Sequence, residues 1–235
     1  MKIDWKTFKI HYTRPKKGLF PTGSRVYKGY QGSGKTLSMV KYALDIHKKF
    51  PDALIFSNVH IKGIDENHYM YIENDEILKY ALEVQKGERG VLVLLDEAHL
   101  YFNKKNGISL DVLTAISQQR KDRRRLVFSS QIWEELDISL RKQVKEIVSC
   151  RNIFGKIQIN TISDGESLTY DKLAGAYVAK KIDVEVFKHN DTLYNAYSTY
   201  QKIITNDNYE RQYATTNNIS SLDLSRKQIK KLARP

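Results

Sequence analysis

Apolar and polar positions along residues 23–154 alternate with two different periods, and this pattern predicts strands and helices in turn. A continuous apolar run such as Val91–Leu95 is typical of a strand that is buried on both faces. Apolar residues three or four positions apart, as in Gly34–Lys48, are typical of an amphipathic helix. Such an alternation favours an α/β fold in which helices cover both faces of a mainly parallel, five-stranded sheet. The expected strands are 25–28, 53–59, 91–95, 126–130 and 146–153, and the expected helices are 34–48, 75–85, 110–119 and 135–145.

The pattern changes near residue 154, where the helical periods stop. Lys156–Asn160 and Ile182–Phe187 alternate between apolar and polar residues, which predicts further strands between polar loops. We therefore divide the chain into a basic N-terminal segment (1–22), an α/β core (23–154), a β-rich extension packed on the edge of the core (155–205) and a basic C-terminal tail (206–235). The tail ends in the basic stretch 226–234, for which a helix and a solvated, disordered end both stay open.

A glycine-rich segment lies between the first expected strand and the first expected helix. Gly29–Thr36 matches the pattern G-x-x-x-x-G-K-T, in which glycines let backbone N–H groups curl around phosphate oxygens. The helix that follows adds a partial positive charge at its amino end. In this motif Lys35 reaches the β- and γ-phosphates of ATP, and the Thr36 hydroxyl binds Mg²⁺. The expected nucleotide contacts are Gly29, Gln31, Gly32, Ser33, Gly34, Lys35, Thr36 and Leu37.

Two acidic residues follow the apolar run 91–95. A strand that ends in a carboxylate places it at the carboxyl edge of the sheet, where open α/β sheets bind their ligands. We expect Asp96 to hold Mg²⁺ and Glu97 to orient and polarise the attacking water. A kinase for a small molecule does not need the second carboxylate, so the pair favours ATP hydrolysis coupled to mechanical work.

Further candidates surround the strand 126–130. This strand should lie between the strands that precede Gly29 and Asp96, so Gln131 at its tip is expected close to the γ-phosphate, where it could report hydrolysis. The basic cluster 120–125 precedes the same strand. One of its arginines, with Arg120 as the first choice, could reach the ATP of a neighbouring subunit, and the others could contact DNA phosphates or simply be solvated. Arg141 is a second candidate for the arginine that acts in trans.

The net charge indicates which kind of partner the protein binds. The chain has a formal charge of +12, which favours a polyanion, nucleic acid before an anionic membrane surface. Its single cysteine, Cys150, excludes an intrachain disulfide and suits a reducing cytosol. The longest apolar run has five residues, far below the roughly 20 that a membrane span needs, so we expect no integral span.

These motifs together resemble the HerA/FtsK superfamily of DNA-pumping ATPases. The resemblance rests on the phosphate loop, on Asp96-Glu97, and on Arg120 eleven residues before the strand-tip Gln131. Phe56–Val59 and Ile138–Arg141 resemble the zonula-occludens-toxin-like branch, whose relatives include filamentous phage assembly ATPases and viral genome-packaging ATPases. The resemblance covers about residues 24–155, with a weaker match at 194–200. It implies a RecA-like (ASCE) P-loop fold, ATP and Mg²⁺ as cofactors, and ATP sites between the subunits of a ring.

The function implied by this resemblance is an ATP-driven DNA translocase, most simply a viral genome-packaging motor. Its partners would be double-stranded DNA, gripped without regard to sequence by Lys104, Lys105 and the basic tail, and a capsid vertex or assembly protein. The ring would be a hexamer or pentamer, in the host cytoplasm or associated with the virion. Filamentous-phage members carry a membrane span that is not found here. Two alternatives stay open: an assembly or secretion ATPase that acts on protein at a membrane, and a nucleotide-dependent switch or partitioning ATPase.

Overall fold

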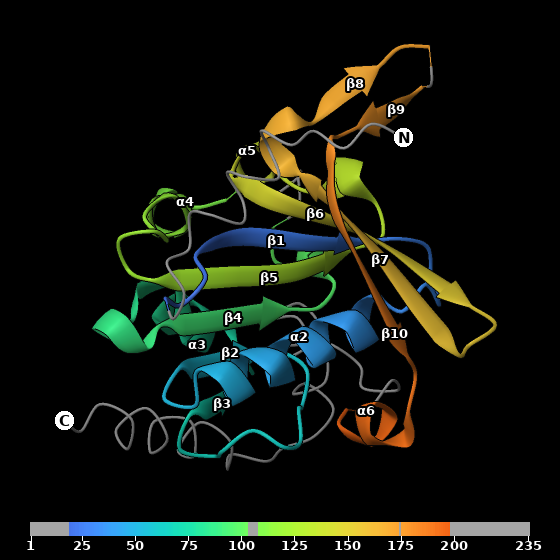
Figure 1. The fold of residues 1–235 in the computed structure, drawn as a ribbon. Coiled ribbons are helices and arrows are strands. Elements are labelled where there is room, and N and C mark those ends of the chain that lie inside the picture. Colours follow the sequence, from blue (N-terminus) through green and yellow to red (C-terminus); the bar gives the residue numbers. More distant parts are fainter. Residues whose placement is uncertain (1–18, 103–107, 174, 198–235) are drawn as a thin grey trace, which may run out of the picture.

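The computed structural model describes residues 19–102, 108–173 and 175–197, and its centre is one twisted sheet (Figure 1). Eight strands form this sheet in the order β10-β7-β6-β1-β5-β4-β2-β3. Strands β6 to β3 in this order run parallel, whereas β7 and β10 are antiparallel additions next to β6. The bounds are β1 Gly23–Lys28, β2 Leu54–Ser57, β3 Tyr69–Tyr71, β4 Val91–Leu95, β5 Arg124–Ser130, β6 Val144–Ile153, β7 Ile157–Asp164 and β10 Lys181–Lys188.

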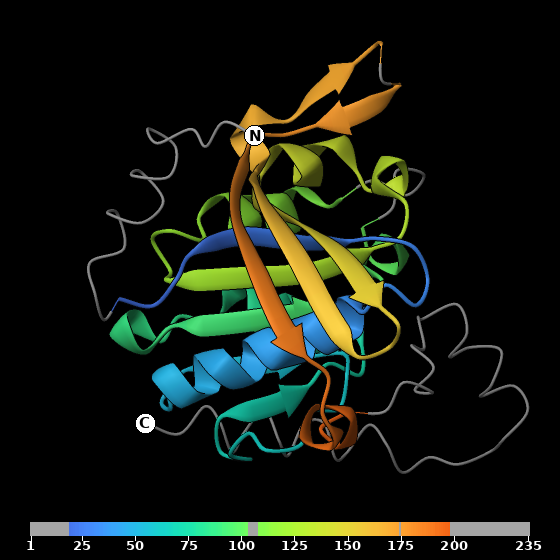
Figure 2. The same cartoon turned by 45° about the vertical axis from the view of Figure 1, so that its right-hand side comes forward.

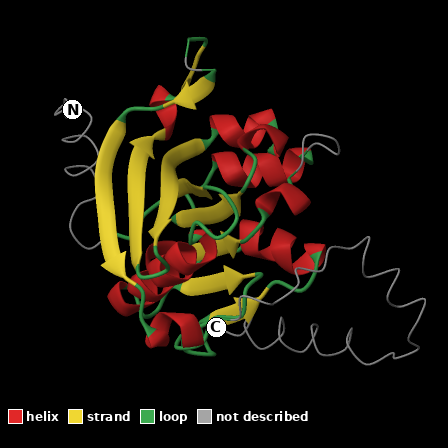
Figure 3. Ribbon diagram, turned by 90° about the vertical axis from the view of Figure 1, so that its right-hand side faces the viewer, coloured by secondary structure: helices red, strands yellow, loops and turns green. Residues whose placement is uncertain are grey.

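Helices cover both faces of the sheet, which explains the continuous apolar runs of its central strands (Figure 3). Helix α2 (Lys35–Lys49) lies on one face with α6 (Asp191–Asn195) beside it (Figure 2). Helices α3 (Asp75–Glu83), α4 (Leu110–Ser117) and α5 (Ile138–Lys142) pack on the other face. All five residues of β4 and all seven of β5 are buried, because both strands lie between these two layers.

The mainly parallel α/β sheet that the pattern predicts is confirmed, and the expected position of β5 between β1 and β4 is confirmed as well. The parallel part has one strand more than expected, because the three residues of β3 are too few to show a period. The helix expected over 135–145 is wrong in its extent. The side chain of Asp137 accepts a hydrogen bond from the N–H of Ser139 and starts α5 at Ile138, and β6 already begins at Val144.

The β-rich segment joins the sheet of the core. A tight turn at Phe154 and Gly155 connects β6 to β7, and β10 then pairs with the outer edge of β7. Strands β8 (Thr169–Asp171) and β9 (Ala176–Val178), which the pattern did not predict, form a separate small hairpin. The sheet is therefore continuous across residue 154. Most of the predicted N-terminal segment and the whole C-terminal tail lie outside the described residues.

An ionic cluster lies buried where β1, β5, β6 and β10 meet. Glu146 on β6 pairs with Arg125, and its Oε2 lies 3.4 Å from Nη1 of Arg25. Arg25 also reaches Glu185 on β10 at 3.1 Å, so the cluster ties the added strands to the core. The two arginines are 5% and 2% exposed. The guanidiniums of Arg125 and Arg25 offset the cost of burial and lower the pKa of Glu146 to about 2.

This burial corrects one expectation about the basic cluster 120–125. Arg124 is fully buried, donates to the carbonyl of Val84 at 2.8 Å and pairs with Asp122, while Arg125 belongs to the ionic cluster. Neither can contact DNA phosphates. Their guanidiniums supply charged partners inside the fold, which explains why β5 begins two residues earlier than its apolar run. Arg120 and Lys121 remain exposed.

Candidate functional site

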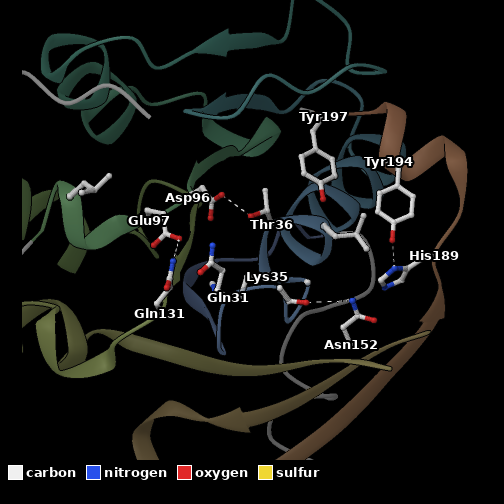
Figure 4. Close-up of a pocket in the computed structure, with 14 residues that line it drawn as sticks. Gln31, Lys35, Thr36, Asp96, Glu97, Gln131, Asn152, His189, Tyr194 and Tyr197 are labelled. Atoms are coloured by element: carbon white, nitrogen blue, oxygen red, sulfur yellow. Dashed lines mark hydrogen bonds between the residues drawn. The ribbon is translucent and has the colours of Figure 1, made fainter. Parts of the chain in front are cut away.

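The glycine-rich loop connects β1 to the amino end of α2 (Figure 4). Gly34 precedes the helix with a φ of 84°, and a Cβ at this position would meet Gln158 Oε1 at 2.0 Å. The backbone conformation therefore favours glycine, and a larger residue would also displace the side-chain amide of Gln158. No side chain caps the amino end of α2, which leaves its N–H groups available to an anion.

Lys35, the first residue of α2, points back into this loop. Its Nζ donates to the carbonyl oxygens of Gly29 at 3.0 Å and of Tyr30 at 3.2 Å, and the residue is only 6% exposed. The ammonium group is thus held against the backbone of the loop by two of its carbonyl oxygens. From this position it can neutralise phosphate oxygens that the N–H groups of the loop bind.

Asp96, at the end of β4, lies opposite the start of α2. Its Oδ2 accepts a hydrogen bond from the Thr36 hydroxyl at 2.7 Å, and its Oδ1 accepts one from Ser129 on β5. The side chain of Asn58, beyond β2, holds the backbone of Asp96 from both sides: it accepts from the N–H at 2.7 Å and donates to the carbonyl at 2.9 Å. The resemblance marked the strand of Asn58, but this clamp is visible only in the structure.

Thr36 and Asp96 fit the requirements of a Mg²⁺ site that includes nucleotide phosphates. Mg²⁺ takes oxygen ligands, keeps several waters, and is commonly held by one or two protein groups plus phosphate oxygens. A hydroxyl and a carboxylate side by side provide that donor set. Within the described ranges, no cluster of three or more His, Cys, Asp or Glu side chains could hold a metal on its own.

Glu97 has a strained backbone, with φ and ψ both 52°. The left-handed conformation of a non-glycine residue costs about 1 kcal/mol or more, and such strain clusters at functional sites. The N–H of Glu97 donates to Ser129 Oγ at 2.9 Å, which holds the turn in place. Its Oε1 accepts from Gln131 Nε2 at 2.8 Å, and its Oε2 lies 3.3 Å from His99 Nδ1 without the alignment of a hydrogen bond.

These groups line one cavity of about 620 Å³ (Figure 4). The size is within the range of small-molecule sites. Its acidic end holds Asp96, Glu97 and Gln131, and its middle is the glycine-rich loop. Of the eight residues expected to bind the nucleotide, Gly29 and Ser33 belong to the loop without lining the cavity. The other six line it: Gln31, Gly32, Gly34, Lys35, Thr36 and Leu37.

The opposite wall of the cavity was missed by the sequence analysis. Asn152 of β6, His189 after β10, and Tyr194 and Tyr197 in and after α6 line this end. Asn152 lies near the end of β6 beside β1, and the other three residues reach the loop only because β7 and β10 add to the sheet. No local motif marks them, and the weak family match at 194–200 was the only sign.

The two candidate arginines do not line the cavity of their own chain. Arg120 is exposed and precedes the amino end of β5, whereas Gln131 follows its carboxyl end, so the strand separates the two. Arg141 lies in α5, and its Nε is buried without a hydrogen-bond partner among the described residues. A role for either arginine at an ATP site therefore requires another subunit.

None of the helices in the described part of the chain is both long and apolar enough to cross a bilayer. Cys150 is a buried thiol, and burial raises its pKa to about 12. It is therefore protonated near neutral pH and poorly reactive.

Comparison with known proteins identifies the family. The zonular occludens toxin (Zot) family matches residues 25–201. Similar solved structures include the N-terminal domain of zonular occludens toxin from Neisseria meningitidis, 19% identical, with a TM-score of 0.53 over 75% of this chain and 98% of that chain. Another is the genome packaging NTPase B204 from Sulfolobus turreted icosahedral virus 2 in complex with ATP-gammaS, 17% identical, with a TM-score of 0.45 over 56% of this chain and 76% of that chain.

A comparison with curated proteins returned no match. The family match covers the core, the antiparallel strands and α6, and therefore both walls of the cavity. The structural similarity to the Neisseria domain agrees with the fold that the motifs predicted. By its sequence and its fold, the chain belongs to the zonular occludens toxin (Zot) family.

Proposed function

We propose that this protein hydrolyses ATP and uses the energy to move double-stranded DNA, as the packaging motor of a viral genome. One observation carries the catalytic part: a phosphate loop, a Thr36–Asp96 pair and a Glu97–Gln131 pair line the same cavity. A P-loop binds the phosphates, the first pair provides the Mg²⁺ ligands, and the carboxylate of the second acts on water. Mg²⁺, when bound, would neutralise charge that develops on the phosphates.

The protein groups divide the work in a defined way. Lys35 and the loop N–H groups hold the phosphate chain, so that the γ-phosphate lies towards Glu97. The Glu97 carboxylate accepts a proton from the attacking water and orients it. Gln131 holds that carboxylate in the present structure and is at the tip of β5, next to β1 and β4. Release of the γ-phosphate changes the hydrogen-bond partners open to Gln131. A shift of Gln131 then moves β5, which lies in the middle of the sheet.

The excess positive charge lies in segments outside the described fold, and this distribution supports a polyanionic partner that binds those segments. Segments 1–18, 103–107 and 198–235 hold 15 of the 39 Lys and Arg residues but only 4 of the 27 Asp and Glu residues. The described part therefore has 24 basic and 23 acidic residues and is close to neutral. The proposed grip on DNA, at Lys104, Lys105 and the tail 206–235, lies outside the described residues. A sequence-independent grip on phosphates by these charges suits a pump.

A ring of subunits completes the proposal. Among the residues that the structure describes, no arginine lines the cavity, and Arg120 is exposed on another side of the fold. An arginine from the next subunit that stabilises transition-state charge contributes on the order of 10³–10⁵ in rate. We propose Arg120 as this residue, with Arg141 as the second choice, in a hexamer or pentamer. The ring would bind a capsid vertex or assembly protein, in the host cytoplasm or on the virion.

Steady-state ATP hydrolysis with and without double-stranded DNA at low salt tests the proposal. We expect DNA to stimulate hydrolysis by the wild-type chain and to have no effect on the Glu97→Gln variant, which serves as the blank. Parallel reactions with anionic vesicles and with capsid or coat protein separate the alternatives. Stimulation by vesicles or protein but not by DNA would replace the pump with an assembly ATPase. Slow hydrolysis that responds to none of them would favour a nucleotide-dependent switch.

The charge distribution leads to a prediction about salt. Replacement of five basic tail residues by glutamine should weaken binding to double-stranded DNA. A plot of log affinity against log salt concentration has a negative slope, and this slope should become less steep by about one unit for each DNA phosphate that the tail no longer neutralises. The measurement is fluorescence anisotropy of a labelled duplex between low and moderate salt. The substituted tail residues are Arg226, Lys227, Lys230, Lys231 and Arg234.

A matched control removes the same charge from the described fold. It replaces by glutamine five exposed lysines that do not line the proposed nucleotide cavity, and we expect it to keep most of the slope. An equal fall in slope for the two variants would show that net charge, and not the tail, governs binding. The control residues are Lys48, Lys62, Lys142, Lys172 and Lys188.

A further inference from the structure

The cavity continues beyond the phosphate loop to an aromatic end that the proposed catalytic chemistry does not use. Tyr194, Tyr197 and His189 lie together there, across α2 from Asp96 and Glu97 (Figure 4). Tyr197 is 9% exposed, whereas Tyr194 remains 43% exposed although its ring is part of the wall. A cavity with phosphate-binding groups in its middle and open aromatic surface at one end has the polarity of a nucleotide.

The aromatic end is fixed to the phosphate loop by a chain of hydrogen bonds. Gln158 on β7 is fully buried, and its Nε2 donates to the carbonyl of Ser33 in the loop at 2.9 Å. Its Oε1 lies 3.3 Å from His189 Nε2, and His189 Nδ1 lies 2.6 Å from the Tyr194 hydroxyl. The same hydroxyl lies 3.3 Å from the carbonyl of Gly155.

The groups at the two ends of this hydrogen-bonded series determine which atoms donate and which accept. The amide oxygen of Gln158 only accepts, so His189 donates from Nε2, and the single hydroxyl proton of Tyr194 is shared between His189 Nδ1 and the carbonyl of Gly155. Burial lowers the pKa of His189, which agrees with a neutral ring. The Tyr194 ring is thus held from its hydroxyl end, and the His189 ring stands at 76° to it with centroids 5.6 Å apart. This leaves the Tyr194 ring in a set position on the cavity wall.

We propose that the base of the bound nucleotide stacks on Tyr194 at this end of the cavity, with Tyr197 and His189 as its walls. The assignment rests on the proposed function, because it places the triphosphate of the same molecule on the Gly29–Thr36 loop. Leu37, which is 2% exposed and lines the cavity, lies directly after the loop, and the ribose spans the gap above it. Phosphate, metal and base contacts then come from three separate parts of one chain.

Stacking on an aromatic side chain gives an effect of measurable size. Loss of one stacked base lowers affinity by about 5- to 100-fold, whatever the identity of the base. Inorganic triphosphate lacks the base, so loss of the stacking side chain should not change its affinity. The two ligands therefore separate a base contact from a general disturbance of the loop, which is needed because Tyr194 is linked to Ser33 through His189 and Gln158.

The test is titration calorimetry of the full chain with ATP and with inorganic tripolyphosphate, both with Mg²⁺. We expect Tyr194→Ala to weaken ATP binding by about 5- to 100-fold and to leave tripolyphosphate within about 2-fold of wild type. Tyr194→Phe keeps the ring and should restore most of the affinity for ATP. Tyr170→Ala, at a tyrosine with 55% exposure on the β8–β9 hairpin, is the matched control and should change neither.

Three kinds of result would contradict the base site, the proposed function or the role of Glu97, and they can be told apart. An equal loss for both ligands in Tyr194→Ala, or no loss for ATP, would overturn the base site. Binding of neither ligand by the wild-type chain would overturn the proposed function and the base site together. Selective loss of ATP in Tyr194→Ala, beside a fully active Glu97→Gln variant, would support the base site and remove the proposed catalytic role of Glu97.

Discussion

Replacement of Glu97 by glutamine is expected to lower the rate of ATP hydrolysis by about two to four orders of magnitude while ATP still binds. In the proposed mechanism the carboxylate accepts a proton from water, and an amide of the same shape cannot do so. The strained backbone at φ 52° and the bond from Glu97 N–H to Ser129 do not depend on the side-chain charge. The variant should therefore fold, bind ATP through Lys35, and stop before the chemical step.

The measurement is phosphate release at saturating ATP together with the dissociation constant for ATP. A fall in kcat without a matching loss of ATP affinity assigns Glu97 to the transition state. Glu135→Gln changes an exposed carboxylate in the turn after β5 and should leave kcat at the wild-type value. A Glu97→Gln variant that kept more than about a tenth of the rate would exclude Glu97 as the general base.

Replacement of Glu146 by glutamine is expected to lower the free energy of unfolding by about 3–5 kcal/mol. This carboxylate is the shared partner of Arg125 and Arg25, and its loss leaves two buried guanidiniums without enough negative charge. Glu185 still reaches Arg25 at 3.1 Å, but its side chain is 43% exposed and the pair is screened by solvent. Urea unfolding followed by circular dichroism measures the loss, and Glu66→Gln at an exposed position is the control.

The same residue sets a dependence of stability on pH. The folded-state pKa of Glu146, about 2, is below its ordinary value of 4.5. Its contribution is therefore fully present above about pH 4.5 and is lost as the pH falls towards 2, by up to about 3 kcal/mol. In the Glu146→Gln variant this part of the acid destabilisation should be missing. An identical acid profile for the variant and the wild-type chain would show that Glu146 does not hold a depressed pKa.

The parts of the site that the sequence predicted are those in which local order is enough. Gly29–Thr36 works through the conformations of adjacent residues and the start of one helix. Asp96 and Glu97 follow a strand whose five apolar residues are typical of a buried central position. Parallel strands end at the same edge of a sheet, so motifs that follow three such strands meet without further information. This is why the expected position of β5 between β1 and β4 agrees with the structure, in which Gln131 at the tip of β5 contacts Glu97.

What the sequence determined by itself was therefore the class of fold, the phosphate loop and the acidic end of the cavity. The tertiary structure decided which charges are buried, and it turned Arg124 and Arg125 from candidate DNA contacts into partners inside the fold. It also decided the aromatic wall, because Gln158, His189 and Tyr194 reach the loop only through the antiparallel pairing of β6, β7 and β10. That pairing depends on register between segments far apart in the chain, and no local period of apolar and polar residues encodes it.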